Sequence, residues 1–531
     1  SHHRLVWLAR REYFYWVDKI GDRALKAAEK VEYFFDAPKN RFLNIIREMK
    51  PWCISRERVW GTPLPIWVCS SCGEKIGLFS RKEIIENAIE LPDGENFELH
   101  RPWIDRIVVR CKKCGGKAYR EPFVLDTWHN SGASPYAAFT DEEYRKYVPV
   151  EFLTEGIDQT RGWAYSLLIL SVILTRGPNS PYKAFLFQGH ILGPDESKMS
   201  KSLGNIIDAN KTLKENSVDA VRFYLVWKNS PIATLVFKPD EIYGRPFQVL
   251  NTLYHLHVYL QQNSVLDNFD DSIYKIDWCM SNNLLTFFDK WILSRCQRLI
   301  ESVSKYYARA EYNEAARELE RFIIEELSQK YVPFVRRELW TDDPKTLKRR
   351  LAIYAVLSYC LKNVDILLHP ISPFVTEKLY LECFKERKES ILFERLPVQR
   401  RELVDDGLES KFKLIDEMVS ETNSLRMKAK LKRRWPVERA VFVFDKMVEF
   451  NEEEFFILRE LCNVKQLDIY SNLNLAPVKL DMKPILQNLG KRFKRDLPLL
   501  LDNLNKVDKS ALAQELKEKN EAKIEFDGKV F

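Results

Sequence analysis

The chain has 531 residues, 45% of them hydrophobic and 12% aromatic, so it is too long for one hydrophobic core and rich enough to fill several. Its 83 basic and 76 acidic residues leave a net charge of +7, which is too small for binding nucleic acid through a global positive field. The sequence has no run of about eighteen apolar residues, which argues against a membrane span. We therefore expect three or four folded units, no membrane partner, and local patches wherever nucleic acid binds.

The first half of the chain has the pattern of an α/β domain with an insertion. Residues 1–50 combine alternating aromatic residues with a helix-like stretch at 22–32 and are not a complete domain. From residue 51 to about 235, apolar runs bounded by glycine and proline alternate with helical stretches such as 163–174, which is typical of a parallel sheet. A smaller unit interrupts this pattern at about 66–122.

The second half predicts helices first and mixed structure afterwards. Residues 236–436 contain few glycines and several long amphipathic runs, so we expect a helix bundle. These runs lie at 287–307, 313–339 and 345–368. In residues 437–531, strand-like segments at 440–444 and 465–470 surround a charged helix, which predicts a small α+β appendage.

Two cysteine pairs lie inside the insertion with the spacing of metal knuckles. Cys69 and Cys72 form one pair and Cys111 and Cys114 the other, with Gly115 after the second pair to permit a tight turn. Four thiolates close a tetrahedral site and leave no open position for substrate, so we predict a structural zinc ion. Two chance pairs or a redox site are the alternatives, although redox motifs need one pair near the start of a β-α-β unit. The other six cysteines lie in apolar surroundings, which favours a reducing compartment, the cytosol.

A loop rich in lysine and serine is the strongest signal for chemistry. Residues 198–202 read KMSKS, and Gly204 follows two residues later. The ammonium groups of Lys198 and Lys201 and the neighbouring hydroxyls suit a polyphosphate whose charge shifts during transfer. The apolar run at 184–187 predicts a buried strand before the loop, and 218–225 predicts a helix after it. A solvated basic turn is the alternative.

Three motifs together identify a family resemblance. KMSKSLGN at 198–205, WCISRERVWGTPLPIW at 52–67 and EGIDQTRGW at 155–163 resemble class I aminoacyl-tRNA synthetases, and in particular the isoleucine enzymes in their archaeal and eukaryotic-like form. The resemblance covers almost the whole chain in collinear order. It implies that residues 1–50 return from an editing insertion to the catalytic domain. It then implies the second half of a Rossmann-type nucleotide-binding α/β domain with a zinc-ribbon insertion, an all-α anticodon-binding helix bundle and a small α+β C-terminal appendage. A leucine or valine enzyme, or a non-catalytic tRNA-binding paralogue or accessory subunit, remains an alternative.

The same resemblance implies ligands and site residues. The ligands would be L-isoleucine, ATP with Mg²⁺, and isoleucine tRNA. Lys198 and Lys201 would contact the ATP phosphates. Residues that would hold the adenylate are Glu155, Gly156, Asp158 and Gln159. Trp60 and Trp163 could line the amino-acid pocket, with plain core packing as the alternative for both.

Two departures from the family pattern affect the expected mechanism. Residues 126–132 read DTWHNSG where the family usually has DVWFDSG, so His129 replaces an aromatic ring and Asn130 a carboxylate. The sequence also has no P-x-x-x-G-x-x-H-x-G-H element, whose histidines stabilise ATP phosphates in this family; the GHILG stretch at 189–193 is not that motif. We therefore expect the chain to be the later part of an enzyme that needs an N-terminal half, in cis or in trans.

A basic run near the end of the predicted bundle is the candidate tRNA contact. Cationic side chains neutralise phosphates, and an aromatic ring can stack on an unpaired base. The residues are Arg426, Lys428, Lys430, Lys432, Arg433, Arg434 and Trp435. A second, weaker candidate is the KRFKR run at 491–495. The alternative for both is a solvated, charged helix face.

Overall fold

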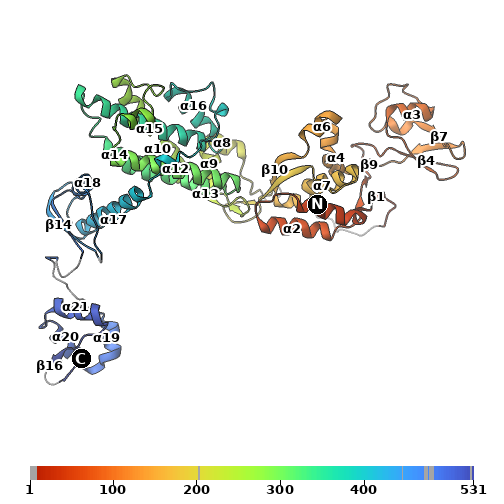
Figure 1. Ribbon diagram of the computed structural model, residues 1–531. Coiled ribbons are helices and arrows are strands. Elements are labelled where there is room, and N and C mark those ends of the chain that lie inside the picture. The colour runs from red at the N-terminus through yellow and green to blue at the C-terminus, as the bar shows by residue number, and fades with distance from the viewer. Residues whose placement is uncertain are drawn as a thin grey trace. The chain divides into compact units, whose positions relative to one another are not determined.

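The computed structural model describes residues 9–200, 204–444, 446–471, 476–477, 484–526 and 529–530. The chain divides into two compact units, residues 1–404 and 405–531 (Figure 1). The first unit holds the α/β domain, its insertion and the helix bundle. The second unit holds the C-terminal elements, and each unit is described by itself.

The α/β domain is centred on two parallel strands joined by an apolar helix. β10 (Val150–Gly156) pairs with β11 (Tyr182–Gln188) in parallel register. Parallel neighbours need a crossover connection, and α7 (Trp163–Thr175) supplies it. No residue of α7 is charged, and Leu168 and Ile169 are fully buried, because other elements cover the helix on several sides. The predicted parallel α/β arrangement and its buried strand at 184–187 are confirmed.

Residues 9–50 complete this domain instead of forming their own. After β1 (Phe14–Tyr15) and η1 (Val17–Ile20), helices α1 (Gly21–Glu29) and α2 (Asp36–Arg47) join the same hydrophobic core as α7 and β11. The backbone of Glu32 donates to the Lys183 carbonyl and accepts from the Phe185 N–H, which extends the strand pairing at β11.

The insertion is a five-stranded antiparallel sheet with its own core. Its strand order is β5 (Lys75–Gly77), β4 (Ile66–Cys69), β8 (Lys117–Arg120), β7 (Val108–Arg110), β6 (Ala88–Glu90). The elements α3 (Arg81–Asn87) and η2 (Ile104–Arg106) lie between strands in the sequence. Trp67 is buried at the centre, and its indole Nε1 donates to the Ile107 carbonyl at 3.0 Å. Two strands precede the insertion in the sequence, β2 (Trp52–Cys53) and β3 (Ser55–Arg56). After the insertion, β9 (Val124–Leu125) pairs with β3 and brings the chain back to the α/β domain.

Helix α9 links the α/β domain to the bundle. Short strands β12 (Ile191–Leu192) and β13 (Leu235–Val236) pair in parallel, and α8 (Ala209–Glu215) and α9 (Val218–Lys228) lie between them in the sequence. The helix that we expected at 218–225 is therefore present. Asp219 accepts the backbone N–H groups of Phe374 and Val375, while the Arg222 guanidinium donates to the Pro370 and Ile371 carbonyls.

The expected helix bundle is confirmed. After η4 (Pro239–Tyr243), its elements are α10 (Arg245–Ser264), α11 (Ile276–Ser281), α12 (Phe287–Ala308), α13 (Tyr312–Arg321), the π-helix η6 (Phe322–Tyr331), α14 (Val332–Val335), α15 (Leu347–Leu368) and α16 (Pro373–Cys383). By length and composition, residues 344–368 could cross a membrane. The helix is instead mostly buried among its neighbours, as the core helix of a bundle is.

The second unit starts with the long helix α17 (Asp406–Lys428), a segment that the sequence analysis assigns to the bundle region. Strands β14 (Val437–Val443) and β15 (Val464–Tyr470) then pair in parallel, with the charged helix α18 (Glu452–Cys462) as their crossover. The last described elements are α19 (Leu486–Phe493), η11 (Lys494–Asp496), α20 (Leu497–Leu504), α21 (Lys509–Lys519), β16 (Glu525–Phe526) and β17 (Lys529–Val530).

A buried ionisable pair joins two helices of the bundle. His257 of α10 and Asp365 of α15 are both fully buried, and His257 Nε2 lies 2.8 Å from Asp365 Oδ2. The other ring nitrogen, Nδ1, lies 2.9 Å from the Leu253 carbonyl oxygen. Burial alone lowers the pKa of His257, but the Asp365 carboxyl and the Leu253 carbonyl raise it overall. The Nε2 atom of His257 and the carboxyl group of Asp365 are therefore hydrogen-bond partners in the buried core.

We expect His257→Ala to destabilise the bundle by about 3–5 kcal/mol, because it leaves Asp365 buried without its partner. The matched control is His255→Ala on the same helix, where the side chain is exposed. Urea unfolding followed by circular dichroism measures both. Equal stabilities for the two variants would contradict the assigned role of the pair.

Candidate active site

The adenylate motif lies at the carboxyl end of β10. Glu155 and Gly156 are the last residues of the strand, and Asp158 and Gln159 follow in η3 (Ile157–Arg161). The Glu155 and Asp158 side chains are exposed at this edge. The carboxyl ends of parallel strands are where ligands bind in open α/β sheets. The short segment that contains the four predicted adenylate residues thus lies at the edge of the sheet where a ligand is expected.

Gln159 fixes the geometry of this segment. Its Oε1 accepts the Trp163 N–H at 2.9 Å at the start of α7, and its Nε2 donates to Asp158 Oδ2 at 2.7 Å. A side chain at Gly162 would clash with it, since a Cβ there would lie 2.3 Å from Gln159 Oε1. One amide side chain therefore both caps the helix and orients the Asp158 carboxylate.

Two tryptophans lie next to this segment. Trp163 is partly buried, and its Nε1 donates to the Ser131 carbonyl at 3.0 Å. Trp128 belongs to α4 (Thr127–Gly132), is 43% exposed, and its ring lies 3.1 Å from where a Cβ on Gly162 would be. Trp128 was not among the predicted pocket residues. The available signal was a tryptophan inside the altered DTWHNSG motif.

Trp60 has different surroundings. Its side chain is 70% exposed, and its ring stacks on His100 of the insertion with centroids 4.5 Å apart. Core packing, the alternative for this residue, does not fit such exposure. Its role in an amino-acid pocket stays a prediction, and Trp128 is the tryptophan found beside Gly162 and the start of α7.

His129 packs as an aromatic ring in place of the usual family residue. Its ring centroid lies 5.7 Å from that of Tyr15 and 6.3 Å from that of Trp52, and its Nε2 lies 3.1 Å from the Tyr15 hydroxyl. Burial lowers the pKa of His129, so the imidazole is neutral near pH 7. The replacement therefore keeps a ring between the returning N-terminal segment and α4 without adding a charge.

The lysine loop follows β12 and is held by one asparagine. Asn205 Oδ1 accepts the Ser200 N–H at 2.8 Å, and its Nδ2 donates to Ser197 Oγ at 2.8 Å and to the Lys198 carbonyl at 3.2 Å. Asp195 in turn accepts from the Ser197 hydroxyl at 2.8 Å. The Lys198 side chain is exposed, whereas Lys201 lies outside the described residues. Sequence analysis quoted Asn205 in the motif but gave it no role, because only the folded loop shows its three bonds.

The four predicted cysteines come together in the insertion. Cys69 and Cys114 have sulfurs 3.5 Å apart, Cys72 and Cys111 have sulfurs 3.7 Å apart, and all four lie within 4.8 Å of one another. Tetrahedral thiolates at a metal–sulfur distance of about 2.3 Å would be about 3.8 Å apart. The spacing is too long for disulfides, and all four cysteines are free. The arrangement is compatible with a closed zinc site made of four thiolates.

Both knuckles use the same backbone turn. Gly73 and Gly115 have φ of 70° and 74°, and each donates its N–H to the carbonyl of the first cysteine of its pair, Cys69 or Cys111. Glycine adopts this left-handed conformation without a steric penalty. The backbone N–H of Cys72 also lowers the pKa of Cys69 to about 6, which favours the thiolate form that metals bind.

The basic run near residue 430 needs one correction. Arg426 is only 4% exposed, and its guanidinium donates to the carbonyls of Trp435, Cys462 and Asn463. Its prediction as a tRNA contact is wrong, because its donors hold the end of α17 to the β14–α18–β15 unit. The other predicted residues are exposed: Lys428, Lys430, Lys432, Arg433, Arg434 and Trp435. Lys432 Nζ lies 5.6 Å from the centroid of the Trp435 ring.

Comparison with known families agrees with this geometry. The family described as tRNA synthetases class I (I, L, M and V) matches residues 5–236, and the anticodon-binding domain of tRNA ligase matches residues 289–441. The solved LeuRS of Agrobacterium radiobacter, in a ternary complex with tRNA and LeuAMS, matches with a TM-score of 0.51 and 23% identity over 67% of this chain and 44% of that one. Mycobacterium tuberculosis methionyl-tRNA synthetase with methionyl-adenylate matches with a TM-score of 0.51 and 16% identity over 70% of this chain and 63% of that one. These structures share the fold, and the chain has the catalytic fold of the class I tRNA synthetases followed by their anticodon-binding domain.

Within that class, curated isoleucine-tRNA ligases match the chain over most of its length. That of Methanopyrus kandleri is 32% identical over 99% of this chain and 49% of the relative. That of Methanothermobacter thermautotrophicus is 33% identical over 99% of this chain and 50% of the relative. That of Pyrobaculum aerophilum is 35% identical over 88% of this chain and 47% of the relative. The chain is thus a homologue of isoleucine-tRNA ligases along almost its entire length, and it spans about half the length of the curated relatives it matches.

We expect the parent protein to bind one metal ion per chain. Cys111→Ser lowers this metal content and also lowers the melting temperature, because metal binding and folding of the insertion are coupled. Cys383→Ser is the matched control, since Cys383 lies in the bundle away from the cluster. Elemental mass spectrometry and thermal unfolding on the same samples measure the two effects. Loss of metal without loss of stability, or no metal in the starting protein purified without chelators, would contradict a structural site.

Proposed function

We propose that this chain supplies the second half of the active site of an isoleucine-tRNA ligase, which activates isoleucine with ATP and transfers it to isoleucine tRNA. The observation that carries the proposal is the position of Glu155 and Asp158 at and just after the carboxyl end of β10, whose neighbour β11 precedes β12 and the lysine loop in the sequence. The names of the curated relatives favour isoleucine over leucine or valine. The adenylate segment favours a ligase over a non-catalytic tRNA-binding paralogue or accessory subunit.

The proposed chemistry needs positioning and charge stabilisation, with little covalent catalysis. The isoleucine carboxylate attacks the α-phosphorus of ATP, pyrophosphate leaves, and the tRNA ribose then takes the aminoacyl group from the adenylate. Lys198 and Lys201 stabilise charge on the phosphate oxygens as the bond to pyrophosphate breaks. Magnesium, bound with ATP, would neutralise part of the same charge.

The substrate would be held at the β10 edge. Glu155 and Asp158 accept hydrogen bonds from the ammonium group and the ribose, and Gly156 lets the ligand approach the backbone. Trp163 and Trp128 line the aliphatic pocket. Gln159 acts through Asp158, whose carboxylate it orients.

Three further parts of the proposal concern the rest of the enzyme. Zinc is the ion of the four-cysteine cluster, because a closed tetrahedral thiolate set suits a structural zinc ion. A histidine-bearing N-terminal half, in cis or in trans, meets the ATP phosphates from the side opposite the lysine loop. The cytosol is the compartment, since it keeps the cysteines reduced.

We expect the chain alone to catalyse no isoleucine-dependent exchange of pyrophosphate into ATP, and exchange to appear when the N-terminal half of a curated relative is supplied. In the complemented enzyme, Lys201→Ala lowers the exchange rate roughly a hundredfold or more, the usual cost of one preorganised donor. Lys211→Ala, an exposed lysine of α8, is the control and changes the rate little. Robust exchange by the isolated chain, or equal effects of the two variants, would refute the assignment.

We expect tRNA binding to have a salt-sensitive phosphate component and a base-specific component. Replacing Lys430, Lys432 and Arg433 together with Gln weakens binding to all tRNAs and flattens the salt dependence, while the preference for isoleucine tRNA partly persists. The matched control replaces three exposed lysines outside both basic runs, Lys413, Lys446 and Lys465, with Gln and leaves the tRNA affinity and its salt dependence little changed. Competition between isoleucine tRNA and the same tRNA with an altered anticodon, titrated with salt, measures both terms. If the two tRNAs bind equally at every salt concentration, only a basic surface remains.

A further inference from the structure

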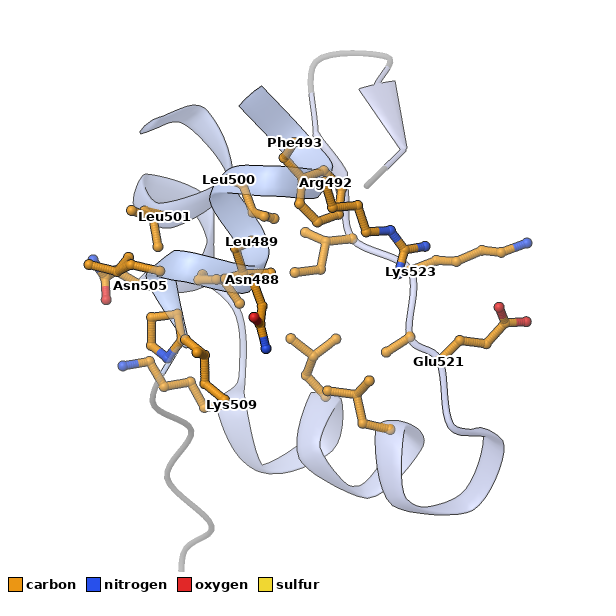
Figure 2. A pocket seen from close by; sticks show the side chains of 18 of the residues that line it. Asn488, Leu489, Arg492, Phe493, Leu500, Leu501, Asn505, Lys509, Glu521 and Lys523 are labelled. Carbon is orange, nitrogen blue, oxygen red and sulfur yellow. The ribbon is translucent and has the colours of Figure 1, made fainter. Parts of the chain in front are cut away.

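A large apolar pocket lies in the last described segment of the chain, and its lining includes Arg492 and Phe493 of the KRFKR run but no residue of the adenylate segment, the lysine loop or the cysteine cluster. Helices α19, α20 and α21, the segment 520–524 and Val530 line it, and its volume is about 760 Å³ (Figure 2). Small-molecule sites usually have volumes of about 300–1,000 Å³. The pocket is therefore of ligand size.

The segment that forms the pocket has a small hydrophobic core of its own. Among the described residues, three apolar residues of its core cluster are buried, Leu500, Leu512 and Ile524, and five partly buried ones pack against them: Leu489, Phe493, Leu504, Val507 and Ala522. Asn503 of α20 is also buried, and neither of its amide atoms has a hydrogen-bond partner among the described residues. A segment this short is marginally stable unless something adds to its core. A molecule that binds the folded segment in the pocket would provide that stabilisation.

The wall of the pocket is apolar and its rim is cationic. Its main apolar residues are Leu489, Phe493, Leu500, Leu504, Leu512, Leu516 and Ile524. Three cations, Arg492, Lys509 and Lys523, line it against one carboxylate, Glu521. Figure 2 shows Arg492 and Lys523 on one side of the pocket, with the Asn488 amide directed toward its centre.

The position of Arg492 suits a headgroup contact. Its guanidinium carbon lies 5.5 Å from the centroid of the Phe493 ring, where a cation–π interaction favours one placement of the long side chain. Both Arg492 and Lys523 are exposed at the rim while Phe493 lines the pocket. A ligand with an apolar body and an anionic end would meet both kinds of group at once.

We propose that this pocket binds an amphipathic anion, an aliphatic chain with a carboxylate or phosphate head. The aliphatic chain lies among the leucines of α19, α20 and α21, and the head lies at Arg492 and Lys523. Apolar burial supplies most of the affinity, and the two cations select the sign of the head. The site is independent of the proposed ligase function, because none of its residues belongs to the adenylate segment, the lysine loop or the cysteine cluster.

The test uses the full chain and isothermal titration calorimetry with sodium decanoate below its micelle concentration. We expect one saturable site, with octanoate binding roughly tenfold more weakly because two fewer methylene groups are buried. Decyltrimethylammonium, which has the same chain and the opposite charge, binds at least about tenfold more weakly than decanoate. No saturable binding of decanoate, or equal affinity for the cationic amphiphile, overturns the proposal.

A pair of variants locates the site. Replacing Arg492 and Lys523 together with Gln weakens decanoate binding roughly tenfold. The control replaces Lys491 and Arg495 with Gln, which removes the same charge from neighbouring positions that do not line the pocket. Thermal unfolding of both variants confirms that they fold, and the chain-length comparison in the parent protein needs no variant. Equal weakening by the two pairs overturns the proposal.

Vesicle binding distinguishes a membrane lipid from a soluble molecule as the source of the anion. If the chain sediments with phosphatidylglycerol vesicles, but not with phosphatidylcholine vesicles, and the Arg492 and Lys523 pair is needed, the head belongs to a membrane lipid. If decanoate binds and neither vesicle does, the ligand is a soluble fatty acid or alkyl phosphate. Vesicle binding that ignores the pocket pair, together with absence of decanoate binding, contradicts the site.

Discussion

Burial of the apolar helix α7 is the constraint on which the catalytic region depends. The helix has no charged residue, and each of its fully buried side chains, such as Leu168 and Ile169, stabilises the fold by about 1.5–3 kcal/mol only because other elements cover it. Strands β10 and β11, helix α1 and the segment around α4 provide that cover. Residues 9–50 are therefore part of this core, although they contain no site residue.

The same packing positions the site. A Cβ on Gly132 would lie 2.7 Å from the Ser166 backbone, so glycine lets α4 lie directly against α7. This contact brings Trp128 beside Gly162, at the start of α7, where Gln159 caps the helix and orients Asp158. Residues from two separate parts of the sequence, 126–132 and 155–163, thus meet at the carboxyl edge of β10 because of one helix–helix contact.

The predictable parts of the structure were those carried by short-range patterns. Two cysteine pairs of fixed spacing predicted the cluster that includes Cys69 and Cys111, and an apolar run predicted strand β11. Roles that depend on distant contacts could not be read in this way. Arg426 looked like its exposed lysine neighbours, yet its partners Cys462 and Asn463 lie over thirty positions further along the chain. The stacking of Trp60 on His100 likewise exists only after the insertion has folded.

The central claim is that the lysine loop faces ATP bound at the β10 edge. The most direct measurement is affinity labelling with periodate-oxidised ATP, which reacts with nearby lysines, on the chain complemented by an N-terminal half. Peptide mapping by mass spectrometry then locates the label. The account predicts labelling at Lys198 and Lys201 that excess ATP prevents. Labelling spread over exposed lysines outside the loop, or labelling that ATP does not prevent, would contradict it.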